Sequence, residues 1–328
     1  MESIYRVEDL KKFFPIKGGG LFKKKHRFVH AVDGVSFEIM KGETFGIVGE
    51  SGCGKTTLAR LLLRLIEPTS GRIFFHDQDV TSLNRKEMKN LRRKMQMIFQ
   101  DPYSSLDPRK TILNIVAEPL KVHKMVSNGS VAERVKEALD LVDLPTSDEF
   151  LGKVPDELSG GQRQRIGIAR TLVLGAEFIV ADEPVSMLDA SVKAGITSLM
   201  MDLKKKIGLT YVFITHEIGL AYYTCDRIAV MYLGKVVELG KADDVIGSPL
   251  HPYTRLLMEA IPPLQPDEQW GKTITERGEL PLFIEPPDGC RFHPRCKWAE
   301  DVCTRDEPGL VSVTDNHYVA CRESVYRI

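Results

Sequence analysis

The sequence predicts an α/β fold with a small appendage, and three observations carry this prediction. Short apolar runs of β-branched character alternate with stretches of helical periodicity, which is typical of a parallel sheet covered by helices. A glycine-rich loop at residues 49–54 stands between one such run and a helical stretch. The length of 328 residues exceeds the usual size of one core, which favours a main domain with a smaller second part.

The elements can be assigned in chain order. The glycines at 18–20 and the basic run at 23–25 predict a solvated hairpin tip. Six apolar runs predict strands: Phe45–Val48, Ile73–Phe75, Met97–Phe99, Phe178–Ala181, Tyr211–Thr215 and Ile228–Tyr232. Residues 101–170 contain ILNIVAEPLKV and SVAERVKEALDLV, which have helical spacing, and no strand candidate, so they predict a helical insert. The proline-rich segment IPPLQPDEQW at 261–270 predicts a domain boundary. We expect a core over 1–100 and 171–260, a helical subdomain over 101–170, and a cysteine-rich domain over 261–328.

Composition limits the possible classes of function. The counts of Lys+Arg and of Asp+Glu are both 45, so the formal charge is zero and a nucleic-acid partner is not expected. The N-terminal MESIYRVEDLKKFF lacks the apolar stretch of a secretory signal, and no apolar run is long enough to predict a membrane-spanning helix. We therefore expect a cytosolic chain, with any membrane role mediated by a partner.

The stretch GIVGESGCGKTT carries the clearest chemistry. Gly49, Gly54, Lys55 and Thr56 fit G-x-x-x-x-G-K-[ST] between a strand and a helix, which is the context this motif requires. Its glycines let consecutive N–H groups point at phosphate oxygens, Lys55 reaches the β- and γ-phosphates, and Thr56 binds Mg²⁺. The complete predicted loop comprises Gly49, Ser51, Gly52, Cys53, Gly54, Lys55, Thr56 and Thr57. Cys53 is interpreted as a small packing residue, with redox control as the alternative.

The stretch FIVADEP supplies the acidic groups that such a loop needs. Four apolar residues of a buried strand end in Asp182 and Glu183, at the carboxyl end where α/β sheets bind ligands. We predict that Asp182 helps to hold Mg²⁺ and that Glu183 acts as general base on the attacking water. The two motifs together predict ATP hydrolysis.

A second anion-binding motif, LSGGQ in VPDELSGGQRQR, identifies the family that this chain resembles. LSGGQ between a phosphate loop and a strand ending in DE resembles the signature of ATP-binding cassette (ABC) ATPases, over about residues 3–255. The resemblance implies a P-loop NTPase core with a mixed sheet and a helical subdomain. It also implies that the signature motif caps the γ-phosphate of ATP bound by a second subunit. The signature residues concerned are Ser159, Gly160, Gly161 and Gln162.

The same resemblance assigns roles to four further positions. Gln100 in MIFQDP is similar to the Q-loop residue that also contacts Mg²⁺, and Asp189 in SMLD to the D-loop residue. His216 in FITHE is similar to the switch histidine at the γ-phosphate. Phe14 is the first candidate for the aromatic that stacks on adenine, and Phe13 remains the alternative.

Three further segments resemble the dipeptide/oligopeptide importer subfamily: the segment 14–37, QDPYSSLDPR and SPLHPYTRLLM. This resemblance implies a second ATPase subunit, expected to be a paralogue, two membrane permease subunits, an extracytoplasmic solute-binding protein, and a place at the cytoplasmic face of the membrane. Peptide is the leading cargo, while oligosaccharides and nickel remain open. A soluble ABC ATPase acting on ribosomes or DNA is the rival class, and a regulator that senses metal in its tail is a third.

Four of the six cysteines lie in the tail with the pattern C-x5-C-x6-C-x17-C. In a reducing compartment such a group favours metal binding over disulfides, and the spacing is wider than in common zinc ribbons. Some relatives in the subfamily are understood to bind a [4Fe–4S] cluster, and we expect one here. Zinc and reduced packing cysteines remain alternatives. The expected ligands are Cys290, Cys296, Cys303 and Cys321.

Overall fold

The computed structural model describes residues 2–16, 27–101, 103–125, 131–260, 286–322 and 324. The chain divides into two compact units. We call one the signature unit (Met1–Glu2, Met40–Thr44 and Ser82–Ile214) and the other the P-loop unit (Ser3–Ile39, Phe45–Thr81 and Thr215–Ile328). The predicted hairpin tip at 18–25 and the predicted boundary at 261–270 lie outside the described residues.

The P-loop unit contains a sheet with strand order β2-β1-β4-β5. Its strands are β1 (Ser3–Ile16), β2 (Arg27–Met40), β4 (Ser70–Phe75) and β5 (Gln78–Asp79). β4 pairs antiparallel with β1 and with β5. Of these strands, the apolar runs predicted only β4.

A second group of strands in the P-loop unit is mixed in direction. β9 (Arg227–Tyr232) pairs in parallel with β3 (Thr44–Val48) and antiparallel with β10 (Lys235–Lys241). Every residue of β3 is buried, as expected for a strand covered on both faces. The mixed sheet implied by the family resemblance is therefore confirmed.

The signature unit contains three strands in parallel. β7 (Phe178–Asp182) pairs on one side with β6 (Met95–Ile98) and on the other with β8 (Thr210–Thr215). β7 and β8 are buried along their whole length. All six strands predicted from apolar runs are confirmed, because short apolar runs are typical of strands covered on both faces, as β7 and β8 are.

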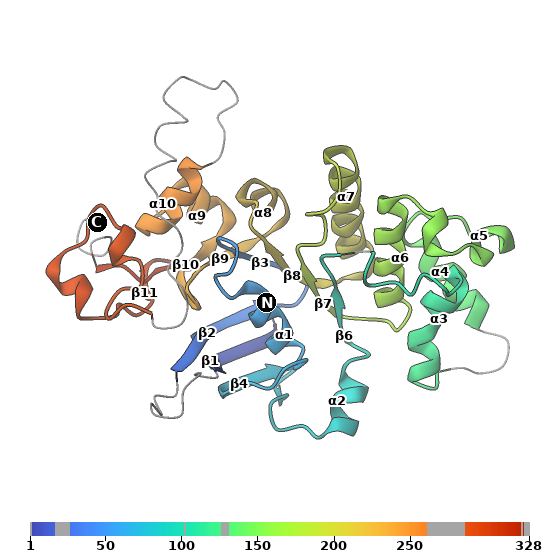
Figure 1. The fold of residues 1–328 in the computed structure, drawn as a ribbon, viewed down its shortest axis with the longest axis horizontal. Helices are drawn as coiled ribbons and strands as arrows, with labels where there is room; N and C mark the ends of the chain where they lie inside the picture. Colours follow the sequence, from blue (N-terminus) through green and yellow to red (C-terminus); the bar gives the residue numbers. More distant parts are fainter. Residues whose placement is uncertain are drawn as a thin grey trace. The chain divides into compact units, whose positions relative to one another are not determined.

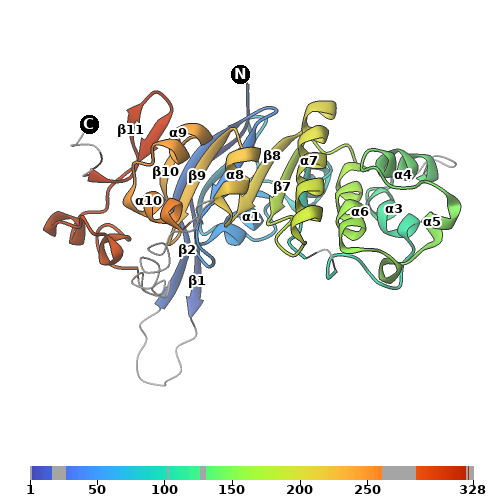
Figure 2. The same ribbon diagram turned by 90° about the horizontal axis from the view of Figure 1, so that it is seen from above.

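Helices fill the predicted insert. Figures 1 and 2 both show α3, α4, α5 and α6 gathered in one group, and no strand interrupts the described residues between 101 and 170. α7 begins where the Asp189 carboxylate accepts a 3.0 Å hydrogen bond from the Val192 N–H, and it ends at Gly208 in a left-handed conformation. The helices of the signature unit are α2 (Arg85–Leu91), α3 (Ile112–Val122), α4 (Val131–Asp140), α5 (Asp148–Gly152), η1 (Pro155–Glu157), α6 (Gly160–Leu172) and α7 (Ala190–Ile207).

The helices of the P-loop unit are short. They are α1 (Lys55–Leu62), α8 (Ile218–Thr224), α9 (Ala242–Gly247), α10 (Pro252–Glu259), η2 (His293–Arg295) and η3 (Asp301–Thr304). α10 begins with Pro252 at its first position, where a missing N–H costs nothing, and the His251 ring accepts the Tyr253 N–H at 3.0 Å. Among the described helices, none combines the length and the apolar character needed to cross a membrane.

The cysteine-rich segment is not confirmed as a distinct domain. Its strands β11 (Val311–Thr314) and β12 (His317–Val319) pair with each other, and β12 pairs with β10, with Glu238 opposite Val319. The tail therefore extends the sheet of the P-loop unit. The expectation of a separate domain rested on the proline-rich break in composition, which carries no information about strand pairing beyond it.

The buried carboxylate of Glu238 stabilises this extension of the sheet. The Glu238 side chain has no exposed surface and accepts a 2.8 Å hydrogen bond from Nε2 of His317, whose side chain is 5 % exposed. It also accepts the backbone N–H groups of Leu250 and His251 at 2.9 and 2.8 Å. One carboxylate thus joins β10, the start of α10 and the tail strand.

We predict that Glu238→Ala lowers the free energy of unfolding by about 3 kcal/mol, because it leaves three buried donors without an acceptor. Thermal or urea unfolding of the whole chain measures this change. Glu177→Ala is the matched control, since Glu177 forms an exposed 2.9 Å ion pair with Lys94 whose loss should cost less than about 1 kcal/mol. Equal losses for the two variants would contradict the role given to Glu238.

Candidate functional site

The phosphate-binding loop predicted at 49–54 joins β3 to α1 in the P-loop unit. Gly54 has φ 109° and caps the N-terminus of α1. A Cβ atom at this position would lie 2.1 Å from the carbonyl oxygen of Ala31, so no residue other than glycine fits without moving backbone. This close approach turns the loop so that α1 begins directly after it, and unpaired N–H groups at a helix start attract anions.

Lys55 is buried and lies inside the loop. Its ammonium donates hydrogen bonds to the carbonyl oxygens of Gly49 at 2.8 Å and Glu50 at 3.0 Å. A buried lysine at the start of a helix concentrates positive charge in a small volume. The arrangement is suited to binding a polyphosphate.

The other predicted loop residues divide by exposure. Ser51, Gly52 and Thr56 are exposed, and Thr57 is half-buried. Cys53 is fully buried, and burial raises the pKa of its thiol to about 11. The thiol is therefore protonated at neutral pH, which agrees with a packing role and gives it little reactivity.

The signature motif begins α6 in the signature unit. The Ser159 hydroxyl accepts the Gln162 N–H at 3.3 Å, and the Gln162 side chain accepts the Ser159 N–H at 3.0 Å. This reciprocal cap fixes the residue at which α6 begins. The backbone N–H groups of the first helical turn follow directly after the capping serine. A Cβ on Gly161 would lie 2.7 Å from Cγ1 of Val192 in α7, whereas a Cβ on Gly160 would have ordinary contacts.

The strand β7 delivers two carboxylates with different surroundings. Asp182, its last residue, is buried. Glu183 follows in a left-handed backbone conformation with φ 48°, and its N–H donates to the carbonyl oxygen of Ile214 at 2.9 Å. Nε2 of Gln100 donates to the Glu183 carboxylate at 3.1 Å, so the structure brings together two of the predicted site residues.

Sequence reasoning missed one residue that joins two motifs of the signature unit. The buried Gln164 of α6 donates from Nε2 to the carbonyl oxygen of Pro184 at 2.6 Å, directly after Glu183. A signal was available, because Gln164 precedes the buried Ile168 by one helical turn and so shares its inward face. The signature helix and the acidic turn are therefore held together by a side chain outside both motifs.

The remaining predicted positions are accessible. His216 is exposed just after β8, and Asp189 caps α7, where the Val192 N–H is the first cause that lowers the pKa of its carboxyl. Phe14 on β1 is 38 % exposed. Phe13 packs on His30 with ring centroids 4.1 Å apart. Phe14 is therefore the more exposed of the two aromatic side chains.

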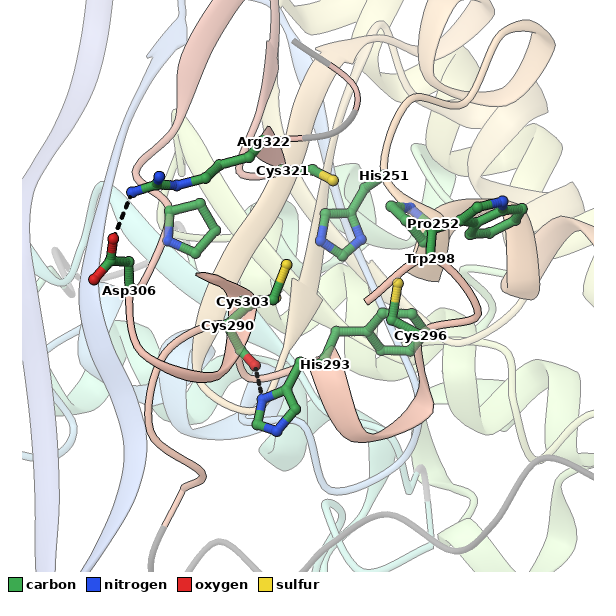
Figure 3. A pocket seen from close by; sticks show the side chains of 12 residues that line it. His251, Pro252, Cys290, His293, Cys296, Trp298, Cys303, Asp306, Cys321 and Arg322 are labelled. Carbon is green, nitrogen blue, oxygen red and sulfur yellow. Dashed lines mark hydrogen bonds and ion pairs between the residues drawn. The ribbon is translucent and has the colours of Figure 1, made fainter. Parts of the chain in front are cut away.

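The four tail cysteines line one pocket of the P-loop unit (Figure 3). All six cysteines of the chain are free thiols. Burial raises the pKa of Cys290, and raises that of Cys296 to about 11. In the described part of the chain, no group of three or more His, Cys, Asp or Glu side chains could hold a single metal ion.

Comparison with known protein families gives two matches. Residues 32–186 match the family described as "ABC transporter". Residues 237–303 match the family described as "Oligopeptide/dipeptide transporter, C-terminal region". The second match covers the start of α10 and three of the four tail cysteines.

The chain is also similar to named proteins along nearly its whole length. It is 46% identical to the "Oligopeptide transport ATP-binding protein AppF" of Bacillus subtilis, over 98% of this chain and 97% of that protein. It is 46% identical to the "Probable peptide ABC transporter ATP-binding protein y4tS" of Sinorhizobium fredii, over 98% and 90%.

Two solved structures share the fold. The dimeric cassette MJ0796, a bacterial ABC transporter cassette, is 30% identical with a TM-score of 0.63, over 73% of this chain and 98% of that one. CbiO1 of Clostridium perfringens, part of the transporter complex cbiONQ, is 28% identical with a TM-score of 0.64, over 76% and 92%.

We predict that Gly161→Ala impairs ATP hydrolysis by at least about tenfold, because the added methyl displaces the signature helix from Val192. Steady-state hydrolysis measures the effect. Gly167→Ala is the control on the same helix, since a Cβ there meets no atom within 4 Å. The double variant Gly161→Ala/Val192→Ala should recover activity. A double variant no better than the single one would show that lack of space is not the cause.

We predict that iodoacetamide at pH 8 leaves Cys53 unmodified in the folded chain and modifies it in urea. The rise of its pKa from 9.0 to about 11 reduces the thiolate population about 100-fold, and burial restricts access further. Mass spectrometry of the peptide containing Cys53 gives the readout. Rapid labelling of Cys53 in the folded chain would instead support redox control.

Proposed function

The chain belongs to the ABC transporter family, and from this premise we propose that it is the ATP-hydrolysing subunit of an importer for oligopeptides or dipeptides. The observation that carries the proposal is the joint match of its cassette and of its C-terminal residues 237–303 to peptide transporters. The intact phosphate loop and the acidic turn after β7 support catalytic competence.

The loop residues bind the nucleotide in this proposal. The N–H groups at the start of α1 and the ammonium of Lys55 contact phosphate oxygens, and Phe14 stacks on adenine. Mg²⁺ neutralises charge on the phosphates, and Thr56, Gln100 and Asp182 offer the hydroxyl, amide and carboxylate oxygens that this ion prefers. The roles of these residues rest on the family resemblance.

Glu183 performs the chemical step. Its carboxylate accepts a proton from the attacking water as the oxygen adds to the γ-phosphorus, and the bond to the β-phosphate oxygen breaks to give ADP and phosphate. The hydrogen bond from Gln100 supports an oriented carboxylate at this position. His216 contacts the γ-phosphate in the same proposal.

A second cassette completes each nucleotide site. Ser159, Gly160, Gly161 and Gln162 present the N-terminus of α6 to the ATP held by the partner, and Asp189 contacts the facing subunit. The capped start of α6 supports this assignment, because its N–H groups are already fixed in direction. The similar cassette MJ0796 forms a dimer.

The importer assembly follows from the family. We infer that two cassettes, this chain and a paralogue, bind two membrane permeases at the cytoplasmic face, and that a solute-binding protein outside delivers cargo. Closure of the cassettes on ATP drives the permeases toward the outward-facing state, and hydrolysis resets them. Oligosaccharides and nickel are the alternative cargoes. The zero net charge and single cassette disfavour a soluble factor on ribosomes or DNA.

We also propose that Cys290, Cys296, Cys303 and Cys321 hold a [4Fe–4S] cluster. Their common pocket supports a group larger than one ion, because each thiolate binds a different iron. Zinc and reduced packing cysteines remain the alternatives. The bound group would crosslink a tail that has few strands of its own, which stabilises its fold.

We predict that the chain, reconstituted in lipid with its paralogue, its permeases and its solute-binding protein, hydrolyses ATP faster when peptide is present. Glu183→Gln should reduce hydrolysis by about 100-fold or more while ATP binding persists, because the general base is lost. Phosphate release and ATP titration measure the two properties. Stimulation by an oligosaccharide or by nickel, with none by peptides, would assign a different cargo.

We predict that the chain purified without oxygen is brown, absorbs broadly at about 400 nm and contains four irons per chain. Cys303→Ser should lose the absorbance, whereas Cys225→Ala, at a buried cysteine of the P-loop unit outside the pocket, should keep it. A colourless protein with one zinc per chain would refute the cluster.

A further inference from the structure

Glu50 of the phosphate loop is bound through all three of its polar groups. Its N–H donates to the hydroxyl oxygen of Tyr253 at 2.9 Å, and its carbonyl oxygen accepts from Lys55. Its carboxylate accepts two hydrogen bonds from the guanidinium of Arg295, at 2.8 and 3.0 Å. Tyr253 and Arg295 both lie in the C-terminal region, about 200 residues or more from the loop in sequence.

Arg295 is held in place from several directions. Its side chain is 10 % exposed, and the guanidinium lies 5.8 Å from the ring centre of Tyr232 and 5.9 Å from that of Phe292. Its hydrogen bonds with Glu50 are the first cause that raises the pKa of Arg295 above its usual value. A bidentate arginine–carboxylate pair that is shielded from water holds its two side chains in a fixed relative position better than an exposed ion pair does.

The segment that carries Arg295 is itself anchored to the P-loop unit. Arg291 donates to the Asp33 carboxylate and to the carbonyl oxygen of Leu233. Phe292 packs edge-on against Tyr232, with ring centroids 5.3 Å apart at 88°. Arg295, which lies between Cys290 and Cys296, is therefore carried by a segment that is itself packed against the P-loop unit.

Electrostatics explains why the loop needs this arginine. Glu50 places a carboxylate one residue after Gly49 in a loop whose proposed ligand carries several negative charges. Without a countercharge, this carboxylate would repel the phosphates and compete for the Lys55 ammonium. The bidentate hydrogen bonds from Arg295 neutralise the charge of the Glu50 carboxylate and fix its orientation.

We propose that Arg295 is a positioning residue for the phosphate loop, acting on nucleotide binding through Glu50. This inference rests on the proposed function only in taking ATP as the ligand of the loop. It places part of the nucleotide site in the C-terminal region, outside the residues that match the general ABC transporter family.

The test compares ATP affinity of the whole chain for Arg295→Gln, Arg295→Lys, Glu50→Gln and the double variant Glu50→Gln/Arg295→Gln. We expect Arg295→Gln to raise Kd by about tenfold or more, because the Glu50 carboxylate loses its partner. The Kd of Arg295→Lys should lie between the values of the wild type and of Arg295→Gln, since an ammonium cannot bind both carboxylate oxygens in the same way. The double variant should bind ATP more tightly than Arg295→Gln alone, because the unpaired charge is gone.

Arg322→Gln is the matched control, since Arg322 is a tail arginine that pairs with Asp306 at 3.0 Å on the surface. It should change Kd by less than about twofold. Thermal unfolding checks that the variants fold. If Arg295→Gln does not fold, Arg295→Lys decides the question: a Kd above that of the wild type supports the proposal, and a wild-type Kd overturns it.

Two results would overturn the proposal: wild-type Kd in the folded Arg295 variants, or no gain in affinity on removing the Glu50 charge from the Arg295→Gln background. Failure of the wild-type chain to bind ATP would instead refute the proposed function.

Discussion

The conformation of the phosphate loop depends on one constraint, which is the close packing of its backbone against β2 and against the C-terminal region. This packing restricts the path that the loop can take. Gly54 leaves no room for a side chain against Ala31, and Glu50 is bound at its N–H, its carbonyl and its carboxylate. A loop that is already fixed loses little conformational entropy when a ligand orders it. The partners that fix it come from β2, from α10 and from η2 of the P-loop unit.

The signature unit follows the same principle with different residues. Its helix start is capped before any partner arrives, and Gln164 ties that helix to the turn that presents Glu183. Glu183 adopts a left-handed conformation, which costs free energy for a residue with a side chain and persists only where neighbours impose it. In each unit, hydrogen bonds with side chains thus hold the backbone next to the groups that we propose act on phosphate.

The sequence predicted those parts of the molecule that local patterns determine. The buried strands could be predicted because short continuous apolar runs indicate buried strands. The phosphate loop could be predicted because the spacing of its motif is specific. β10 was missed because Glu238 interrupts it, and only partners at residues 250, 251 and 317 make that carboxylate tolerable. β1 was missed because its alternation is broken by a bulge between Glu8 and Lys11. The Glu50–Arg295 pair joins positions 245 residues apart, which no local pattern reveals.

Our proposal makes the C-terminal region part of the nucleotide site, and amide hydrogen exchange tests that claim most directly. Exchange is measured on the whole chain with and without Mg·ATP. If the two regions form one cooperative unit, nucleotide should slow exchange at the Glu50 amide and, in parallel, at those amides in 290–296 that bond within the tail. These are the amides of Cys290, His293, Arg295 and Cys296. Slower exchange in the phosphate loop with unchanged exchange at 290–296 would contradict the account.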